Sequence, residues 1–275
     1  MAVYLFLPIR ARDIEERAQP ISAALLSTKL AIRHLLRFRK VPVRVHAHIN
    51  GPATPGEQTH WMEHFTSTFH PLALVTASPV ADKIASVNYG LSQARAAGFK
   101  HFIVIDNDIV FRKQIFERLT DVHVCVNADA VCVWKLPLIV PCSSSFERLF
   151  AYATSVSLRL NIYRAPTGSL YCIDPHRVAE FPANCNEGDH LLTALNSFLC
   201  DDVFVASRPS ATLDGEIQRR KRINAASRAI GYQRPHHDPD QLRALMKGFV
   251  LPTCVSRHRF GESRELTDHV MRSAL

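Results

Sequence analysis

Two carboxylates, Asp106 and Asp108, follow an apolar run that begins at His101 and has the pattern of a buried strand. A buried strand gains nothing from paired negative charges at its end unless a positive group binds there. Carboxylate oxygens are the ligands that Mg²⁺ and Mn²⁺ prefer, and in enzymes these ions commonly hold phosphate groups. The pair therefore predicts a Mg²⁺ or Mn²⁺ site that serves phosphate-linked chemistry.

Lys83, Asn88 and Gly90 precede this strand in a segment that is predicted to be a helix from about residue 81 to residue 97. Together with Asp106 and Asp108, their order and spacing resemble the GT-A glycosyltransferases, family 2 in particular. The resemblance implies a nucleotide-sugar donor that contacts Lys83, Asn88 and Asp106, and a metal ion bound by Asp106 and Asp108. The alternative is an ordinary helix followed by a strand that is capped with turn-forming residues.

Two later segments carry the same resemblance. Residues 166–174 resemble the glycine-containing strand on the acceptor side, and residues 186–195 resemble a Glu-Asp-x-x-Leu segment. The Asp of that segment is the catalytic base of inverting family members, so the resemblance implies this role for Asp189. A single displacement would invert the anomeric carbon, and the acceptor hydroxyl would belong to a glycan, a lipid-linked or a small-molecule acceptor. A helix N-cap is the alternative role for Asp189.

Three further parts of the sequence are candidates for contact with the donor or the metal ion. Asn50 stands at the end of the second predicted strand, where family members usually carry a base-binding Asp; an amide still suits a base edge but does not favour uracil. Residues 218–222 resemble the Gln-x-x-Arg-Trp motif of processive members but lack its Trp. We therefore expect a non-processive enzyme in which Arg222 lies near the donor pyrophosphate, or else a solvated basic helix face. His258 is a candidate third metal ligand.

The elements that must position these residues alternate between strand and helix patterns in the first half of the chain, which predicts an α/β fold. We expect a mixed, mostly parallel central sheet flanked by helices, and the resemblance specifies the GT-A fold. Further predicted elements include a strand at residues 122–126 and a helix at residues 190–199.

The predicted domain organisation is one catalytic domain with a C-terminal extension. Residues 1–207 are expected to form the catalytic domain, with a nucleotide-sugar-binding half at 1–111 and an acceptor half at 112–207. Residues 208–275 are expected to form a basic helix and an arm that pack on the same domain.

Composition limits the class of protein. With 275 residues, 47% of them hydrophobic, the chain can bury a large core. The seven cysteines are scattered without a CxxC pair or zinc-finger spacing, as in a cytosolic protein with reduced thiols. A net charge of +8 favours an anionic partner, such as nucleotide phosphates or the inner face of an anionic membrane. A nucleic-acid motif is not recognised, so no nucleic-acid binding is expected.

Three other functions remain open at this stage. A haloacid dehalogenase-like phosphatase would use Asp106 as its nucleophile, although that motif normally opens the domain. A nucleotidyltransferase would need a glycine-rich, Arg-bearing loop after the first strand, and the sequence lacks one there. A non-enzymatic basic module would bind nucleic acid or membrane through residues 218–234 and would be indifferent to the substitution Asp108→Ala.

Overall fold

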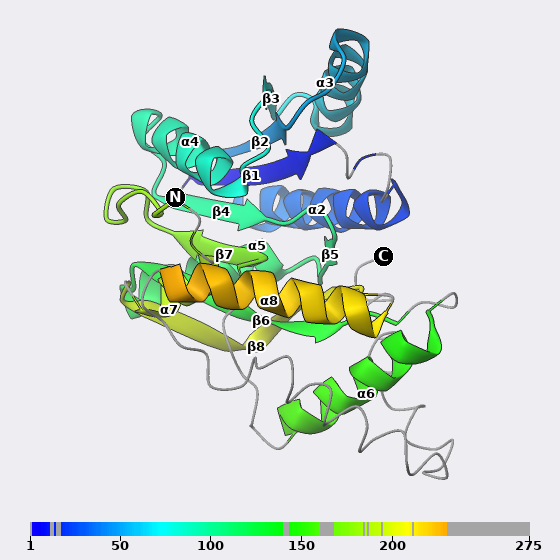
Figure 1. Cartoon of the computed structure of the whole chain (residues 1–275). Helices are drawn as coiled ribbons and strands as arrows, with labels where there is room; N and C mark the ends of the chain where they lie inside the picture. Colours follow the sequence, from blue (N-terminus) through cyan, green and yellow to red (C-terminus); the bar gives the residue numbers. More distant parts are fainter. Residues whose placement is uncertain are drawn as a thin grey trace.

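The computed structural model describes residues 2–11, 14, 18–139, 143–159, 168–183, 185, 187–193, 195–210 and 212–229. An eight-stranded sheet with strand order β3-β2-β1-β4-β7-β6-β8-β5 runs through the middle of this part, with helices on both faces (Figure 1). The strands are β1 (Val3–Arg10), β2 (Val43–Asn50), β3 (Ala73–Ser78), β4 (His101–Ile105), β5 (Ile109–Val110), β6 (Ala130–Pro137), β7 (Leu170–Ile173) and β8 (Ser197–Ser207). The helices are α2 (Ala18–Arg39), α3 (Pro55–Phe69), α4 (Lys83–Ala96), α5 (Ile115–Val126), α6 (Ser145–Arg159), α7 (Glu187–Thr193) and α8 (Leu213–Ala229).

The sheet is mixed and mostly parallel. The strands β3, β2, β1 and β4 are parallel to one another, as are β6 and β8. By contrast, β7 lies antiparallel between β4 and β6, and β5 pairs antiparallel with β8. The predicted α/β class, with a mixed, mostly parallel sheet flanked by helices, is therefore confirmed.

The strand order reverses at β1. The chain moves from β1 to β2 and β3 on one side, and then returns to place β4 on the other side of β1. In open α/β sheets a reversal of this kind leaves a crevice outside the carboxyl ends of the strands, where ligands bind. Asn50 and Asp106 are at or directly after the carboxyl ends of β2 and β4, so the fold brings them to the same edge.

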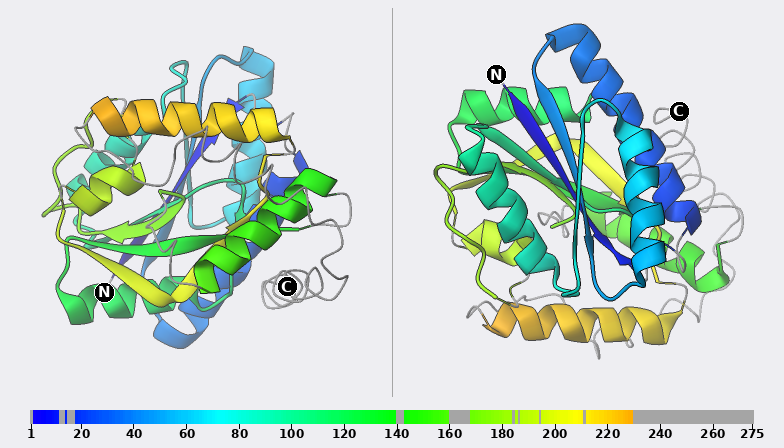
Figure 2. Two further views of the ribbon diagram at one scale, coloured as in Figure 1. Left: turned by 60° about the horizontal axis from the view of Figure 1, so that its bottom comes forward. Right: turned by 90° about the horizontal axis from the view of Figure 1, so that it is seen from above.

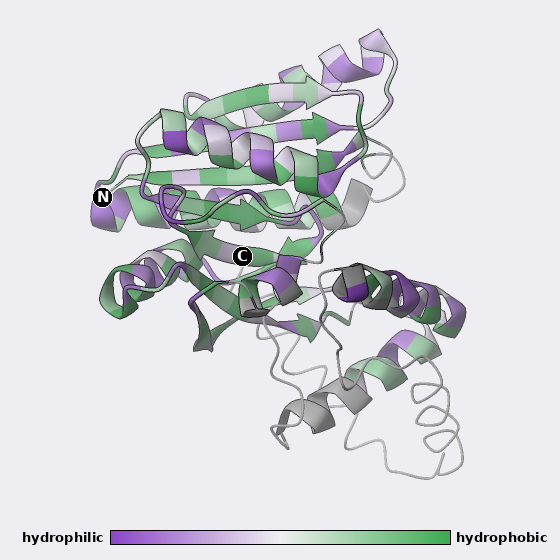
Figure 3. Cartoon of the chain, turned by 60° about the vertical axis from the view of Figure 1, so that its left-hand side comes forward, coloured by the Kyte–Doolittle hydropathy of each residue, from purple (hydrophilic) through white to green (hydrophobic). Residues whose placement is uncertain are grey.

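The alternation of side chains along β1 explains the two helix layers. Val3, Leu5 and Leu7 belong to a buried apolar cluster with residues of α2, α3 and α5, whereas Tyr4 and Phe6 belong to a cluster with residues of α4. The right-hand view of Figure 2 shows α4 on one side of the strands and α2 and α3 on the other. The central strands are mostly hydrophobic along their length (Figure 3), as expected for a sheet covered on both faces.

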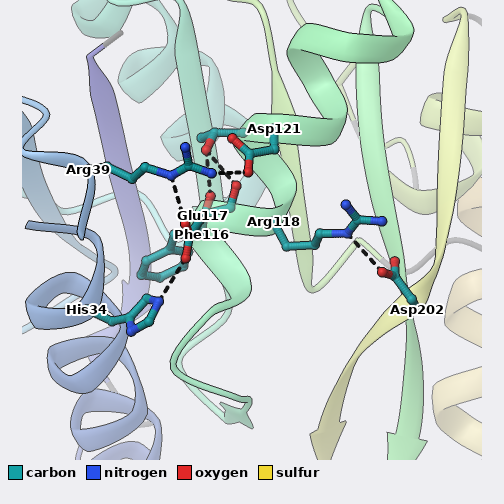
Figure 4. Close-up of polar contacts among 8 residues, drawn as sticks. His34, Arg39, Phe116, Glu117, Arg118, Asp121 and Asp202 are labelled. Carbon is teal, nitrogen blue, oxygen red and sulfur yellow. Dashed lines mark hydrogen bonds and ion pairs between the residues drawn. The ribbon is translucent and has the colours of Figure 1, made fainter. Parts of the chain in front are cut away.

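Polar contacts join α5 to the elements on either side of it (Figure 4). Glu117 of α5 is 2.8 Å from His34 Nε2 and accepts a hydrogen bond from Arg39 Nε at 2.7 Å, both on α2. Arg118 of α5 donates to Asp202 of β8 at 2.8 Å. These contacts fix the register of α5, whose apolar residues cover the same face of the sheet as α2.

Two predicted elements were wrong. Residues 122–126 belong to the end of α5, where Val122 packs into the core and Val124 is 62% exposed. The prediction was wrong because valines at every second position are also typical of a strand. The predicted helix at 190–199 is divided: α7 ends at Thr193, and β8 begins at Ser197 and pairs with β6 from Ala130. In the second case, pairing with β6, which is distant in the sequence, makes the residues from Ser197 onward a strand.

The predicted basic C-terminal helix is present as α8. Ile217 is buried and packs against α6 and the start of α8, and Glu216 beside it is fully buried. The predicted arm after residue 229 lies outside the described residues. None of the described helices is long and apolar enough to cross a membrane.

Candidate active site

Lys83 and Asp106 meet at the carboxyl end of β4. The Asp82 side chain caps α4 by accepting hydrogen bonds from the N–H groups of Ile84 and Ala85, so that Lys83 lies in the first turn. The N–H of Asp106 donates to the Ser169 carbonyl at 2.8 Å. Between these anchors, Lys83 Nζ is 2.5 Å from the Asp106 carboxylate.

Glu187 is a second partner of Lys83. Its carboxylate is 2.6 Å from Lys83 Nζ, and the Tyr171 hydroxyl donates to it at 2.7 Å. Lys83 also donates to the Gly168 carbonyl at 3.2 Å. A Cβ at Gly168 would lie 2.9 Å from Glu187 Cβ, so the glycine allows α7 to approach this closely. One ammonium group thereby joins α4, β4, α7 and the segment before β7.

The electrostatics of this cluster favour a charged Lys83. Burial alone would lower the pKa of Lys83, but Asp106 and Glu187 outweigh that effect and raise the pKa above its usual range. Burial raises the pKa of Glu187, against the attraction of Lys83. Burial and the neighbouring Glu187 carboxylate also raise the pKa of Tyr171 well above its usual value, so Tyr171 stays a neutral hydrogen-bond donor.

Lys135 of β6 adds a second ammonium group near the Asp pair. It donates to Ser169 Oγ at 3.1 Å. Burial lowers the pKa of Lys135, opposed by the negative charges of Asp108 and Asp106, while Arg219 of α8 is close enough to lower it further. The sequence analysis did not assign Lys135 to the site. The available signal was that Lys135 is the only charged residue in the apolar strand β6.

Asn50 is a buried amide at the end of β2. Its side chain is 1% exposed, and neither its nitrogen nor its oxygen has a hydrogen-bond partner among the described residues. The backbone turns at once at Gly51, which has a φ of +110° and whose N–H donates to the Ser78 carbonyl. Buried polar groups in folded proteins nearly always have partners, so this amide is a candidate for a contact with a ligand.

Asn88 and Gly90, the other motif positions on α4, have structural contacts. The Asn88 amide donates to the Phe181 carbonyl at 2.9 Å and accepts from the Phe181 N–H at 2.8 Å. Gly90 lies against the ring of Phe6, where a Cβ would be 2.5 Å from two ring carbons. Asn88 therefore positions the chain before α7, and its contact with a donor stays a prediction.

Three further predicted residues, Asp189, Arg222 and His258, belong to the later part of the chain. Asp189 is in α7, two residues after Glu187, and its side chain lies outside the described part of the structure. Arg222 is exposed on α8. His258 lies outside the described residues altogether.

Comparisons with known proteins found similar solved structures at low sequence identity. No protein-family model matches the chain, and no curated protein does. The chain is similar to S. aureus TarS, with 13% identity, a TM-score of 0.49 and coverage of 94% of this chain but only 44% of that one. It is also similar to residues 1–349 of TarS in complex with UDP-GlcNAc, with 13% identity, a TM-score of 0.47 and coverage of 100% and 82% of the two chains.

A third similar structure comes from Desulfovibrio desulfuricans G20 and is provisionally assigned as a nucleotide-diphospho-sugar transferase. Its identity to this chain is 11% and its TM-score 0.43, with 90% of this chain and 99% of that chain covered. All three TM-scores are below 0.5 and all three identities are below 15%. The function must therefore be inferred from the side chains of this chain.

Proposed function

We propose that this protein is a metal-dependent, inverting glycosyltransferase of the GT-A, family 2-like type, which transfers a sugar from a nucleotide diphosphate to an acceptor hydroxyl. The observation that carries the proposal is the buried, unpartnered Asn50 amide on the same sheet edge as the Lys83, Asp106 and Glu187 cluster. An amide can donate to and accept from the edge of a planar base, and cations can bind a diphosphate. This edge offers both.

The donor would lie across the crevice where the strand order reverses. Asn50 would bind the edge of the base, and Asp106 would hold the ribose or share the metal ion through water. Lys83 and Lys135 would supply positive charge to the phosphates, and Arg219 and Arg222 of α8 would extend it. Arg219 contributes to the lowered pKa of Lys135, which supports a position of α8 near Lys135.

The residues at the tip of β4 fit a divalent cation. Asp106 and Asp108 present carboxylate oxygens, which suit Mg²⁺ or Mn²⁺, and these ions need only one or two protein carboxylates. Because Asp106 is already paired with Lys83, Asp108 would be the more direct ligand, and His258 is proposed as a third. Such an ion, when bound, neutralises charge that develops on the pyrophosphate leaving group.

Asp189 would take the proton of the acceptor hydroxyl as that hydroxyl attacks the anomeric carbon from the opposite face. Glu187 anchors the start of α7 to Lys83 and Tyr171, so the donor cluster and the proposed base are parts of one assembly. A single displacement with one base inverts the anomeric carbon. A glycan, a lipid-linked or a small-molecule acceptor is proposed, with peripheral contact to an anionic membrane at a cytoplasmic location.

A thermal-shift series tests the donor site, because a ligand that binds the folded state raises the unfolding temperature. UDP, GDP, CMP and dTDP would be compared with and without Mn²⁺, and we expect stabilisation by at least one nucleotide that grows with the ion. Asp189→Asn should abolish sugar transfer and keep this stabilisation. The absence of any nucleotide effect would overturn the proposal, and phosphate release without an acceptor would favour the phosphatase alternative.

A further inference from the structure

A second cluster of polar side chains lies at the other end of β4, in the interior. His101 begins β4, His123 is in the last turn of α5, and Cys172 is in β7, paired with Ile103. Their exposed fractions are 5%, 7% and 0%. One nitrogen of each histidine and the cysteine sulfur all lie within 4.8 Å of one another.

Hydrogen bonds within the cluster cannot satisfy all three groups. His123 Nδ1 is 3.0 Å from His101 Nδ1 and 3.6 Å from Cys172 Sγ. In a neutral ring, Nδ1 carries either one proton or one lone pair, so it can complete only one of these two contacts. His101 Nδ1 and Cys172 Sγ therefore compete for the same His123 nitrogen, whereas a cation at the point where the three atoms converge could accept a lone pair from each of them.

The polar network under α4 shows a different arrangement. There, His46 Nδ1 is 2.7 Å from the Tyr4 hydroxyl, His46 Nε2 is 2.6 Å from Thr76 Oγ1, and His48 Nδ1 is 2.8 Å from the same hydroxyl. Each histidine in that network faces a hydroxyl, which can donate and accept at once. The cluster at His123 has no hydroxyl among the contacts of its three converging atoms, and its composition is that of a transition-metal site.

We propose that His101, His123 and Cys172 bind a divalent transition-metal ion of the Zn²⁺ class. Imidazole nitrogen and thiolate sulfur are ligands that Zn²⁺ prefers and that Mg²⁺ and Mn²⁺ do not, so this site differs in chemistry from the Asp pair. A tetrahedral ion held by these three ligands keeps a fourth position for water. This proposal does not depend on the proposed glycosyltransferase function.

Binding would convert the Cys172 thiol to a thiolate and release its proton to solvent, with no change of oxidation state. The His123 ring bonds the backbone at Ala128, an orienting contact typical of ligating histidines. The ion would tie β4, α5 and β7 together beneath the sheet surface.

Cobalt substitution provides a specific test, because Co²⁺ bound to a thiolate gives a charge-transfer absorption band that carboxylate-bound Co²⁺ does not. The experiment would use the full chain carrying Cys125→Ser, since Cys125 is an exposed thiol on α5 two residues from His123. After removal of metals, addition of Co²⁺ should produce this band at about one ion per chain, and Zn²⁺ should abolish it and raise the unfolding temperature.

Matched variants separate this site from others. Cys172→Ala and His101→Gln should each abolish the band, whereas Cys132→Ala, at a buried cysteine of β6 in the other apolar cluster, should keep it. Asp108→Ala should also keep the band, whatever it does to nucleotide binding. A folded Cys125→Ser protein without the band, or a band that survives in Cys172→Ala, would overturn the proposal.

Discussion

At the scale of single residues, the candidate active site depends on one ammonium group shared by two carboxylates. Lys83 forms ion pairs with Asp106 and Glu187. Among the described residues, no other cation forms an ion pair with either of these carboxylates. Removing Lys83 would leave two carboxylates facing each other with little exposure to water. Such a change is costly because each carboxylate loses its ion-pair partner.

We therefore expect Lys83→Met to lower the free energy of unfolding by about 3 kcal/mol and to abolish transfer. Adding Glu187→Gln should recover part of the stability, since one of the two uncompensated charges is removed, but should not restore transfer. Urea unfolding and a donor-turnover assay would measure the two effects. Equal stability of Lys83→Met and the unsubstituted protein would show that the ion pairs contribute nothing.

Asn50 should behave in the opposite way. Replacing an unpartnered buried amide by Leu removes a desolvation penalty of about 1–3 kcal/mol, so Asn50→Leu is expected to stabilise the free protein. The same change should eliminate stabilisation by nucleotides. Asn88→Leu is the matched control, because it breaks two hydrogen bonds to Phe181 and should destabilise. A destabilised Asn50→Leu protein would mean that the amide has a partner in the free state.

The sequence predicted part of this site. Asp106 and Lys83 lie on consecutive elements of a repeating α/β pattern, so their meeting at one sheet edge follows from chain order. Glu187 and Lys135 reach this edge because β7 lies beside β4 and β6 lies beside β7. No local sequence pattern predicts that β7 pairs antiparallel with β4. The convergence of His101, His123 and Cys172 was missed for the same reason, since their spacing resembles no zinc motif.

At the scale of elements, packing decides what a motif residue does. Gly90 was noted for its place in a family pattern, but its observed role is to let α4 approach the Phe6 ring of β1. Likewise, the short alternating run at residues 122–126 favours a strand by itself, and the core beneath α5 makes it helical. Elements that are long and clearly periodic were predicted well, whereas short apolar runs needed tertiary contacts to be assigned.

Gly90→Ala is expected to destabilise the protein by about 1–3 kcal/mol, because the new methyl group would meet a fully buried ring at 2.5 Å. This cost exceeds the helix-propensity gain of about 1 kcal/mol. Gly56→Ala in α3 is the control, since nothing lies within 4 Å of its added Cβ, and it should be neutral or slightly stabilising. Adding Phe6→Leu should relieve Gly90→Ala; a Gly90→Ala protein as stable as the control would refute the close contact.

At the scale of the whole molecule, buried neutral histidines link global stability to pH. The pKa of each is lowered chiefly by burial; the group consists of His46, His48, His101 and His123. For such a group the unfolded chain takes up a proton before the folded one does. The stability they contribute is therefore complete above the unfolded pKa of about 6.5 and is lost as the pH falls toward the folded value.

His46 is the clearest test of this linkage, because burial, with His48 and Arg44 adding to it, lowers its pKa to about 3. Between about pH 7 and about pH 5 the unfolded His46 becomes protonated while the folded one stays neutral, which should reduce the free energy of unfolding by about 2 kcal/mol. Urea unfolding at the two pH values should show this loss diminished in His46→Gln. His64→Gln, at an exposed position of α3, should retain the full loss. An identical pH dependence in both variants would mean that His46 takes up its proton while the protein is still folded.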